Sequence, residues 1–213
     1  MYNQCRAGDL SAEGGRLLED RAVALRAQQG DTDAFEELVR RYEEVAFRVA
    51  YLIVREEADA QDVAQEAFLR AYRSLDRYDA GQPFRPWLLR IVTNLALNNR
   101  RSARRRDALS ERAGRDETQR RTATSAEATV IRSEEAEQVW EAIGTLRAEE
   151  QTVLYLRYFL EASEQETAEA IGRPAGTVKS RLHRALRRLR GVIEDRYPDL
   201  AMAIPSEAGE RTQ

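Results

Sequence analysis

Cysteine and histidine are nearly absent from this chain of 213 residues, in which Cys5 and His183 are the single members of their types. One cysteine cannot form an internal disulfide, and one cysteine with one histidine cannot supply a Cys/His zinc site. His183 lies in a basic stretch with no nucleophile or carboxylate pattern around it. We therefore expect no metal, no cofactor and no catalytic residues, and we predict that the chain is not an enzyme.

Long apolar runs are also missing. No run approaches the roughly 20 residues that span a bilayer, and the N-terminal stretch alternates Arg, Asp and Glu without an apolar signal core. Aromatic residues make up 7% of the chain and charged residues 33%, a composition expected of small helical domains joined by linkers. These features predict no membrane insertion and a cytoplasmic location.

Charge is strongly segregated behind the net value of −3. Residues 127–172 hold eleven carboxylates and three arginines, whereas residues 173–190 hold seven cations and no carboxylate. Wound as a helix, residues 175–190 place Val178, Ala185 and the leucines on one side and the cations on the other. Like charges four residues apart repel, so this face predicts a polyanionic partner, with an ordinary solvated basic face as the alternative.

Apolar residues spaced by three or four predict helices at residues 31–53, about 59–75 and about 84–101. Asp31 or Asp33 is expected to cap the first of them. Between the second and third, the stretch from Asp76 to Pro83 contains Gly and Pro and is predicted to be a loop. The second helix is expected to turn these side chains inward: Val63, Ala64, Ala67, Phe68, Ala71, Tyr72 and Leu75.

Residues 107–133 contain few apolar residues and no sustained period, which predicts a flexible linker. Helical spacing then returns, and Ser163 with Glu166 forms a capping-box pattern for a short helix that ends at Gly172. The cationic helix follows directly. Two helices joined by a short Gly-containing turn, the second of them cationic, match a helix-turn-helix, and the alternative is a helical hairpin with a charged back.

In a helix-turn-helix the second helix enters the major groove with its N-terminal residues nearest the base edges. Arg187, Arg188 and Arg190 lie further along this helix and are expected to meet phosphates. The candidate DNA-binding residues at and near the N-terminal end are Arg173, Thr177, Lys179, Ser180, Arg181 and Arg184.

Four blocks of the sequence resemble the extracytoplasmic-function (ECF, group IV) sigma factors of the bacterial primary-type sigma family. "GDTDAFEELVRRYEEVAFRVAYLIV" resembles the opening helix of that family, and "ADAQDVAQEAFLRAYRSLDRY" resembles its polymerase-docking helix. "FRPWLLRIVTNLALNNRRSARRR" is similar to its promoter-melting helix, and "ASEQETAEAIGRPAGTVKSRLHRALRRLR" to its helix-turn-helix. The blocks stand in family order, with an arginine-rich linker and no third sigma domain between them.

The resemblance implies an all-α protein with two small helical domains joined by a flexible linker. Its implied divisions are an N-terminal extension (1–29), sigma domain two (30–106), a linker (107–133), sigma domain four (134–196) and a C-terminal tail (197–213). Domain two is expected to bind core RNA polymerase at the β′ clamp and the minus-ten element of promoter DNA. Domain four is expected to bind the minus-thirty-five element and the polymerase β flap, and an anti-sigma factor is an expected further partner.

By the same resemblance, polymerase binding is assigned to Asp62, Gln65 and Glu66. The alternative is that they form an acidic, solvent-exposed helix face with no binding role. Melting a promoter requires aromatic platforms and a positive groove for unstacked bases. Phe84 and Trp87 have a competing role as core residues, and Asn94 with Asn98 offers amides that can read base edges. The predicted minus-ten and melting residues are Tyr78, Asp79, Phe84, Arg85, Trp87, Asn94, Asn98, Arg100 and Arg101, and Arg104 and Arg105 extend their face toward phosphates.

The chain departs from the family pattern at four positions. Thr167 and Ala170 stand where the scaffold helix usually has branched aliphatic residues, and Arg147 and Gln151 replace a usual proline and arginine. The predicted function is an ECF-type sigma factor that binds core RNA polymerase and directs promoter recognition and DNA opening. Two alternatives stay open: an autonomous helix-turn-helix regulator with a helical sensor domain, and a helical adaptor that does not bind DNA.

Overall fold

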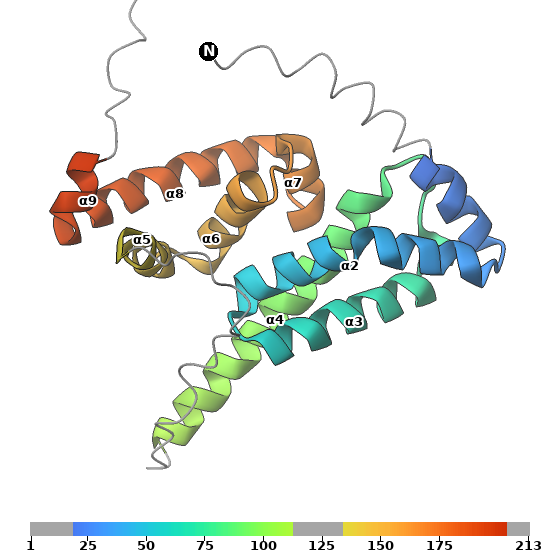
Figure 1. Cartoon of the computed structure of the whole chain (residues 1–213), viewed down its shortest axis with the longest axis horizontal. Helices are drawn as coiled ribbons and strands as arrows, with labels where there is room; N and C mark the ends of the chain where they lie inside the picture. The colour runs from blue at the N-terminus through green and yellow to red at the C-terminus, as the bar shows by residue number, and fades with distance from the viewer. Residues whose placement is uncertain (1–18, 113–133, 204–213) are drawn as a thin grey trace, which may run out of the picture.

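The computed structural model describes residues 19–112 and 134–203, and no residue in these two ranges lies in a β-strand. The first range forms a helical bundle of residues 19–28, α2 (Thr32–Val54), α3 (Glu57–Arg73) and α4 (Phe84–Arg112), with a short 3₁₀ turn η1 (Leu75–Arg77) before α4. Figure 1 shows α2, α3 and α4 packed side by side in this first bundle. The all-α fold class is therefore confirmed for the described residues.

The helix ends follow from local side-chain chemistry. The carboxylate of Asp31 accepts a hydrogen bond from the backbone N–H of Ala34 at 3.0 Å, so Asp31 is the cap of α2 as the sequence predicts. Gly30 precedes it with φ of +94°, a left-handed conformation that suits glycine. The second helix begins before the predicted Asp59, because the Glu56 carboxylate accepts hydrogen bonds from the backbone N–H groups of Ala58 and Asp59.

Residues 19–28 form a helix that packs on the first bundle, although the predicted domain division leaves them in an N-terminal extension. Val23, Ala24 and Ala27 are buried in the same core as α2 to α4. Asp20 is also buried, and its carboxylate accepts hydrogen bonds from the Arg41 guanidinium at 2.7 Å and from the Tyr42 hydroxyl. A buried charge that is paired and hydrogen-bonded fixes this helix against α2.

The α4 helix extends to Arg112, beyond its predicted end near Arg101. Residues 102–112 lack the apolar period from which a helix is usually predicted, but they contain no Gly or Pro and consist largely of Arg, Ala, Leu, Glu and Ser. The part of the predicted linker from 107 to 112 is therefore helical. The remaining linker residues 113–133, Cys5 and most of the predicted N- and C-terminal segments lie outside the described residues.

The second range forms a second bundle of α5 (Glu134–Gly144), α6 (Ala148–Leu154), a π-helical turn η2 (Tyr155–Phe159), α7 (Glu164–Ile171), α8 (Ala175–Arg196) and α9 (Pro198–Ala203). Both halves of the Ser163 and Glu166 capping box are formed at the start of α7. Gly172 ends α7 with φ of +62°, and α8 follows after Pro174. The predicted helix-turn-helix is thus α7, a short turn and α8.

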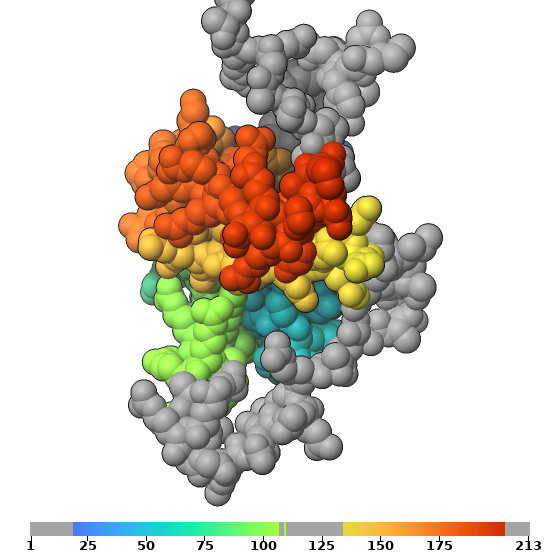
Figure 2. All heavy atoms as spheres, turned by 90° about the vertical axis from the view of Figure 1, so that its left-hand side faces the viewer, coloured from blue at the N-terminus to red at the C-terminus, as the bar shows by residue number. Residues whose placement is uncertain are grey.

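The two bundles lie directly against each other. Figure 2 shows the second bundle, coloured yellow to red, directly above the teal and green atoms of the first bundle, and the two bundles meet mainly where α7 packs on α4 and η2 on α2. One continuous apolar core includes Leu88 and Val92 of α4 together with Leu156 and Ala170 of the second bundle. No helix among the described residues is long and apolar enough to cross a membrane. Within the same ranges, no three His, Cys, Asp or Glu side chains gather as metal ligands.

Candidate nucleic-acid interface

The basic face of α8 points away from the core of the second bundle. Val178 and Ala185 are buried and anchor the helix, with Val178 packed against Val153 of α6 and Ala168 of α7. The cations on the other side are mostly exposed, so the predicted division between a packing side and a charged side is confirmed. Leu186 is an exception, because it is 38% exposed although the helical wheel places it on the packing side. The exposed members of the predicted set are Arg173, Lys179, Ser180, Arg184, Arg187 and Arg188, and Thr177 and Arg181 are partly buried.

Few protein partners compete for this charge. Arg184 donates to the Ser180 carbonyl within its own helix at 3.2 Å, and Arg188 pairs with the nearly buried carboxylate of Glu150 at 3.1 Å. Within the described ranges, Lys179 and Arg187 form no ion pair. Lys179 and Arg187 on the exposed side of α8 are therefore available to an anion such as a DNA phosphate.

The amide face of α4 lies opposite its core side chains Leu88, Leu89 and Val92. Asn94 and Asn98 are exposed one turn apart on this face, as the sequence predicts, and Arg101 is exposed beyond them. Asn94, Asn98 and Arg101 border a cavity of about 190 Å³ whose opposite side includes Arg173 and Arg181. The structure thus brings three of the predicted minus-ten residues and two of the predicted minus-thirty-five residues to the same cavity.

The predicted aromatic platform is largely buried. Phe84 is 1% exposed and Tyr78 4% exposed, and the two rings lie edge to face with centroids 5.6 Å apart. Trp87 is partly buried, with its ring centroid 4.8 Å from that of Tyr78 and 5.4 Å from that of Phe84. Neither Tyr78 nor Phe84 offers a ring face to a base in this arrangement, because both pack in the core of the first bundle.

The loop between η1 and α4 is held by polar contacts. The Tyr78 hydroxyl donates a hydrogen bond to the Gln82 carbonyl, and burial raises the pKa of Tyr78 to about 12. The side chain of Gln28 donates to the carbonyls of Leu75 (2.8 Å) and Tyr78 (2.7 Å). Asp79 is exposed, and its carboxylate accepts from the backbone N–H of Gly81 at 2.8 Å. Of the two predicted melting residues in this loop, Tyr78 is buried and Asp79 is accessible to DNA.

Two predicted DNA-binding arginines instead contact the second bundle. Arg85 pairs with Glu166 at 2.6 Å and donates to the Leu160 carbonyl at 3.1 Å. Burial acts to raise the pKa of Glu166, but the backbone hydrogen bond from Ser163 and the charge of Arg85 outweigh it, so this pKa lies below its usual value. Arg100 donates to the side-chain oxygen of Gln151 at 2.6 Å, and burial, with repulsion from neighbouring arginines, lowers the pKa of its guanidinium.

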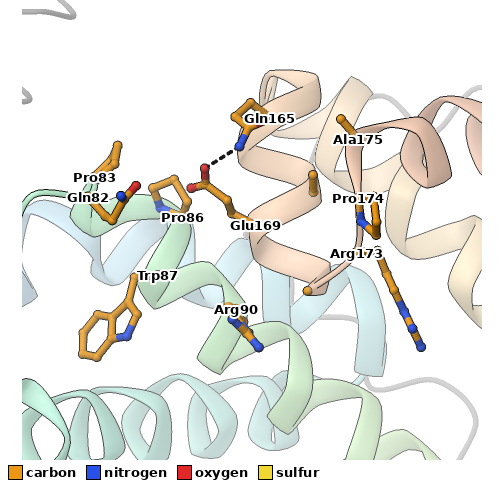
Figure 3. A pocket seen from close by; sticks show the side chains of 12 residues that line it. Gln82, Pro83, Pro86, Trp87, Arg90, Gln165, Glu169, Arg173, Pro174 and Ala175 are labelled. Carbon is orange, nitrogen blue, oxygen red and sulfur yellow. Dashed lines mark hydrogen bonds between the residues drawn. The ribbon is translucent and has the colours of Figure 1, made fainter. Parts of the chain in front are cut away.

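A larger cavity of about 690 Å³ opens between the start of α4 and the helix-turn-helix. Figure 3 shows Pro86, Trp87 and Arg90 of α4 on one side and Arg173 and Pro174 of the turn on the other. The dashed contact in Figure 3 is the 2.8 Å hydrogen bond from Gln165 to Glu169 within α7. This cavity exists because the two bundles meet along α4 and α7.

The outer face of α3 combines acidic and apolar side chains. Asp62 and Gln65 are exposed, and Glu66 is partly exposed and bonded to Arg70 at 2.7 Å. Leu69 is 51% exposed and Tyr72 48% exposed on the same side. The prediction that Tyr72 turns inward is wrong, because its ring packs edge-on against Phe35 at the rim of the bundle. The sequence-based prediction therefore missed Leu69 and Tyr72 as part of this surface. Their spacing from residues 62, 65 and 66 places all five positions on one helix face.

Comparison with known proteins places both bundles in one family. Residues 38–106 match the model of Sigma-70 region 2, and residues 136–189 match that of Sigma-70 region 4. The ECF RNA polymerase sigma factor SigW of Bacillus subtilis (strain 168) is 33% identical over 174 residues, which cover 79% of this chain and 93% of SigW. The ECF RNA polymerase sigma-E factor of Haemophilus influenzae is 36% identical over 191 residues, covering 86% of this chain and 97% of the relative.

A solved structure shares the arrangement of the helices. CnrH, determined in complex with the cytosolic domain of CnrY, superposes with a TM-score of 0.60 at 27% identity, covering 83% of this chain and 98% of CnrH. The fold described above is therefore shared with this structure over most of both chains. The chain therefore belongs to the family of ECF RNA polymerase sigma factors.

Proposed function

We propose that this sigma factor binds core RNA polymerase through the first bundle and reads a promoter at two places, one with each bundle. The observation that carries the proposal is the pair of separate polar reading faces, one on α8 and one on α4, within a chain of this family. The chain is thus a transcription initiation factor, and the polymerase supplies the catalysis. Because polymerase and promoter DNA are the proposed partners, we place its action in the cytoplasm.

The minus-thirty-five element is assigned to the helix-turn-helix. Thr177, Lys179, Ser180 and Arg181 lie in the first two turns of α8, where a recognition helix is nearest the base edges. Arg173 and Arg184 flank these turns. Arg187 and Arg188 lie further along the helix and are assigned to phosphates, which position the protein without reading sequence.

The minus-ten element is assigned to the exposed face of α4 and the loop before it. Asn94 and Asn98 can donate to and accept from base edges, and Arg101 continues their face toward the phosphates. Asp79 is assigned to the same surface because it is exposed at the tip of the loop. We assign Tyr78 and Phe84 the role of supporting this loop from the core, with Trp87 at its edge. Arg85 and Arg100 become available to DNA phosphates when the two bundles separate.

The outer face of α3 is assigned to polymerase. Asp62, Gln65 and Glu66 supply hydrogen-bond acceptors and charge, and Leu69 and Tyr72 add exposed apolar surface. Aromatic and apolar side chains beside polar ones are typical of the centre of a protein interface. We also propose an anti-sigma factor as a partner, in keeping with the family.

Run-off transcription with purified core polymerase tests the assignment. We expect Arg181→Ala to weaken the closed complex and Asn94→Ala to impair mainly the opening of the duplex, with Arg196→Ala as the matched control because Arg196 is exposed at the far end of α8. Equal activity of core enzyme with and without the chain, across genomic promoters, would contradict the proposal. Tight protection of duplex DNA by the free chain without polymerase would instead support an autonomous regulator.

A further inference from the structure

The two proposed DNA-reading faces meet at one cavity in this structure. Asn94 and Asn98 of α4 and Arg181 of α8 border the same cavity of about 190 Å³. That volume corresponds to about six water molecules at their share of liquid volume, roughly 30 Å³ each. A recognition helix enters a major groove about 12 Å wide, and the space of about 190 Å³ between Arg181 and the amide face of α4 is too small to admit a DNA duplex.

Arginines of the first bundle hold the second bundle in this position. Arg48 donates to the Phe159 carbonyl at 3.2 Å, and Arg55 donates to the Tyr155 hydroxyl at 3.1 Å while its guanidinium lies 4.0 Å from the centre of the Trp140 ring. Arg85 and Arg100 add the contacts with Glu166 and Gln151. All four arginines reach from the first bundle to the second, and two of them, Arg85 and Arg100, are residues that we assign to promoter DNA.

Gln151 decides whether Arg100 can dock. Its side chain is 1% exposed, and its amide nitrogen donates to the carbonyls of Ile143 (2.8 Å), Gly144 (3.0 Å) and Leu146 (3.1 Å) at the end of α5. The amide oxygen is left as the acceptor for Arg100. An arginine at position 151 can also donate hydrogen bonds to these carbonyls, but it offers no acceptor to Arg100. It also places a second positive charge next to the Arg100 guanidinium.

We propose that the described arrangement is a closed, promoter-incompetent state of the free chain, held by an arginine latch that Gln151 makes possible. The latch consists of Arg85 on Glu166 and Arg100 on Gln151. This inference rests on the proposed promoter binding. Opening frees both arginines and both reading faces, so the apparent affinity of the free chain for a promoter is reduced in proportion to its open fraction.

Two variants outside the DNA-reading faces test the latch. Gln151→Arg removes the acceptor of Arg100, and Glu166→Gln removes the charge opposite Arg85 while keeping an oxygen for the capping box of α7. Glu164→Gln is the matched control, because it makes the same charge change in the same turn at an exposed position. Circular dichroism melting curves identify any variant that fails to fold.

The distance between the bundles is measured by fluorescence energy transfer between dyes attached to Asp76→Cys and Asp195→Cys. The labelled chain also carries Cys5→Ser, and the measurement is made without polymerase. Affinity is read by fluorescence anisotropy with a duplex that carries both promoter elements. We expect Gln151→Arg and Glu166→Gln to lower the transfer efficiency and to raise promoter affinity at least threefold, with no change in the control.

Unchanged transfer efficiency in both folded variants would overturn the latch, and so would a fall in transfer efficiency without any gain in affinity. Run-off transcription by the wild-type chain with core polymerase separates this failure from a failure of the proposed function. If the wild type supports promoter-dependent transcription while the variants behave as wild type, the latch alone is wrong. If the wild type supports none, the promoter assignment fails and the latch fails with it.

Discussion

Phe84 can be either a core residue or a platform for an unstacked base, and the structure favours the core. The ring is 1% exposed and lies 5.4 to 5.6 Å, centre to centre, from Tyr42, Tyr78 and Trp87. Removing a buried Phe side chain costs about 3–5 kcal/mol through lost burial and the cavity left behind. Phe84→Leu keeps most of the apolar volume, so we expect it to cost only about 1.5 kcal/mol.

Urea unfolding followed by circular dichroism measures these costs. The reconstituted holoenzyme is then tested for binding to a single-stranded minus-ten oligonucleotide from a promoter that it transcribes. A base stacked on an aromatic ring contributes about 1–3 kcal/mol, which corresponds to a change in affinity of roughly 5- to 150-fold. We expect Phe84→Leu to change this affinity less than twofold. A loss of more than fivefold with unaltered stability would refute the core assignment.

Three further predictions concern charge and hydrogen bonding. Arg187→Gln should reduce the slope of log affinity against log salt for a minus-thirty-five duplex by about 0.9, because one phosphate contact is lost, and an unchanged slope would remove Arg187 from the interface. Glu166 has a depressed pKa, so its stabilising contact with Arg85 is fully present above pH 4.5 and is lost as the pH falls through the lowered pKa. The difference in unfolding free energy between wild type and Glu166→Gln should therefore shrink below pH 4.5, and a constant difference there would contradict this reasoning. Gln28→Ala should cost about 1–3 kcal/mol in urea unfolding, because two partly buried carbonyls lose their donor; a cost under about 0.5 kcal/mol would show that water replaces the amide.

Local chemistry made much of the fold predictable. Asp31, Ser163 and Gly172 mark helix ends by capping rules that act over three or four residues, and the structure places all three as expected. The start of α3 was misplaced because its cap is Glu56, a residue outside the usual capping set. The helix at residues 19–28 was missed although Val23, Ala24 and Ala27 have helical spacing, because that apolar stripe is short.

The contacts between the bundles could not be predicted from the sequence. Arg100 and Gln151 are 51 positions apart, and Arg85 and Glu166 are 81 apart. No local period or cap encodes such pairs, because only the packing of α4 on the second bundle brings them together. The reading faces on α4 and α8 were predictable one at a time from helical periodicity, whereas their mutual approach was not.

The position of Trp140 gives the molecule a built-in optical signal. Its indole lies beneath the Arg55 guanidinium and stacks on Phe159 with ring centres 4.8 Å apart. The aromatic neighbours of Trp87, the second of two tryptophans, are Tyr78 and Phe84 of the first bundle. Indole emission responds to nearby charge and to water, so parting of the bundles changes the surroundings of Trp140 by withdrawing Arg55. Intrinsic fluorescence can therefore follow the motion in unlabelled protein while polymerase or DNA is added.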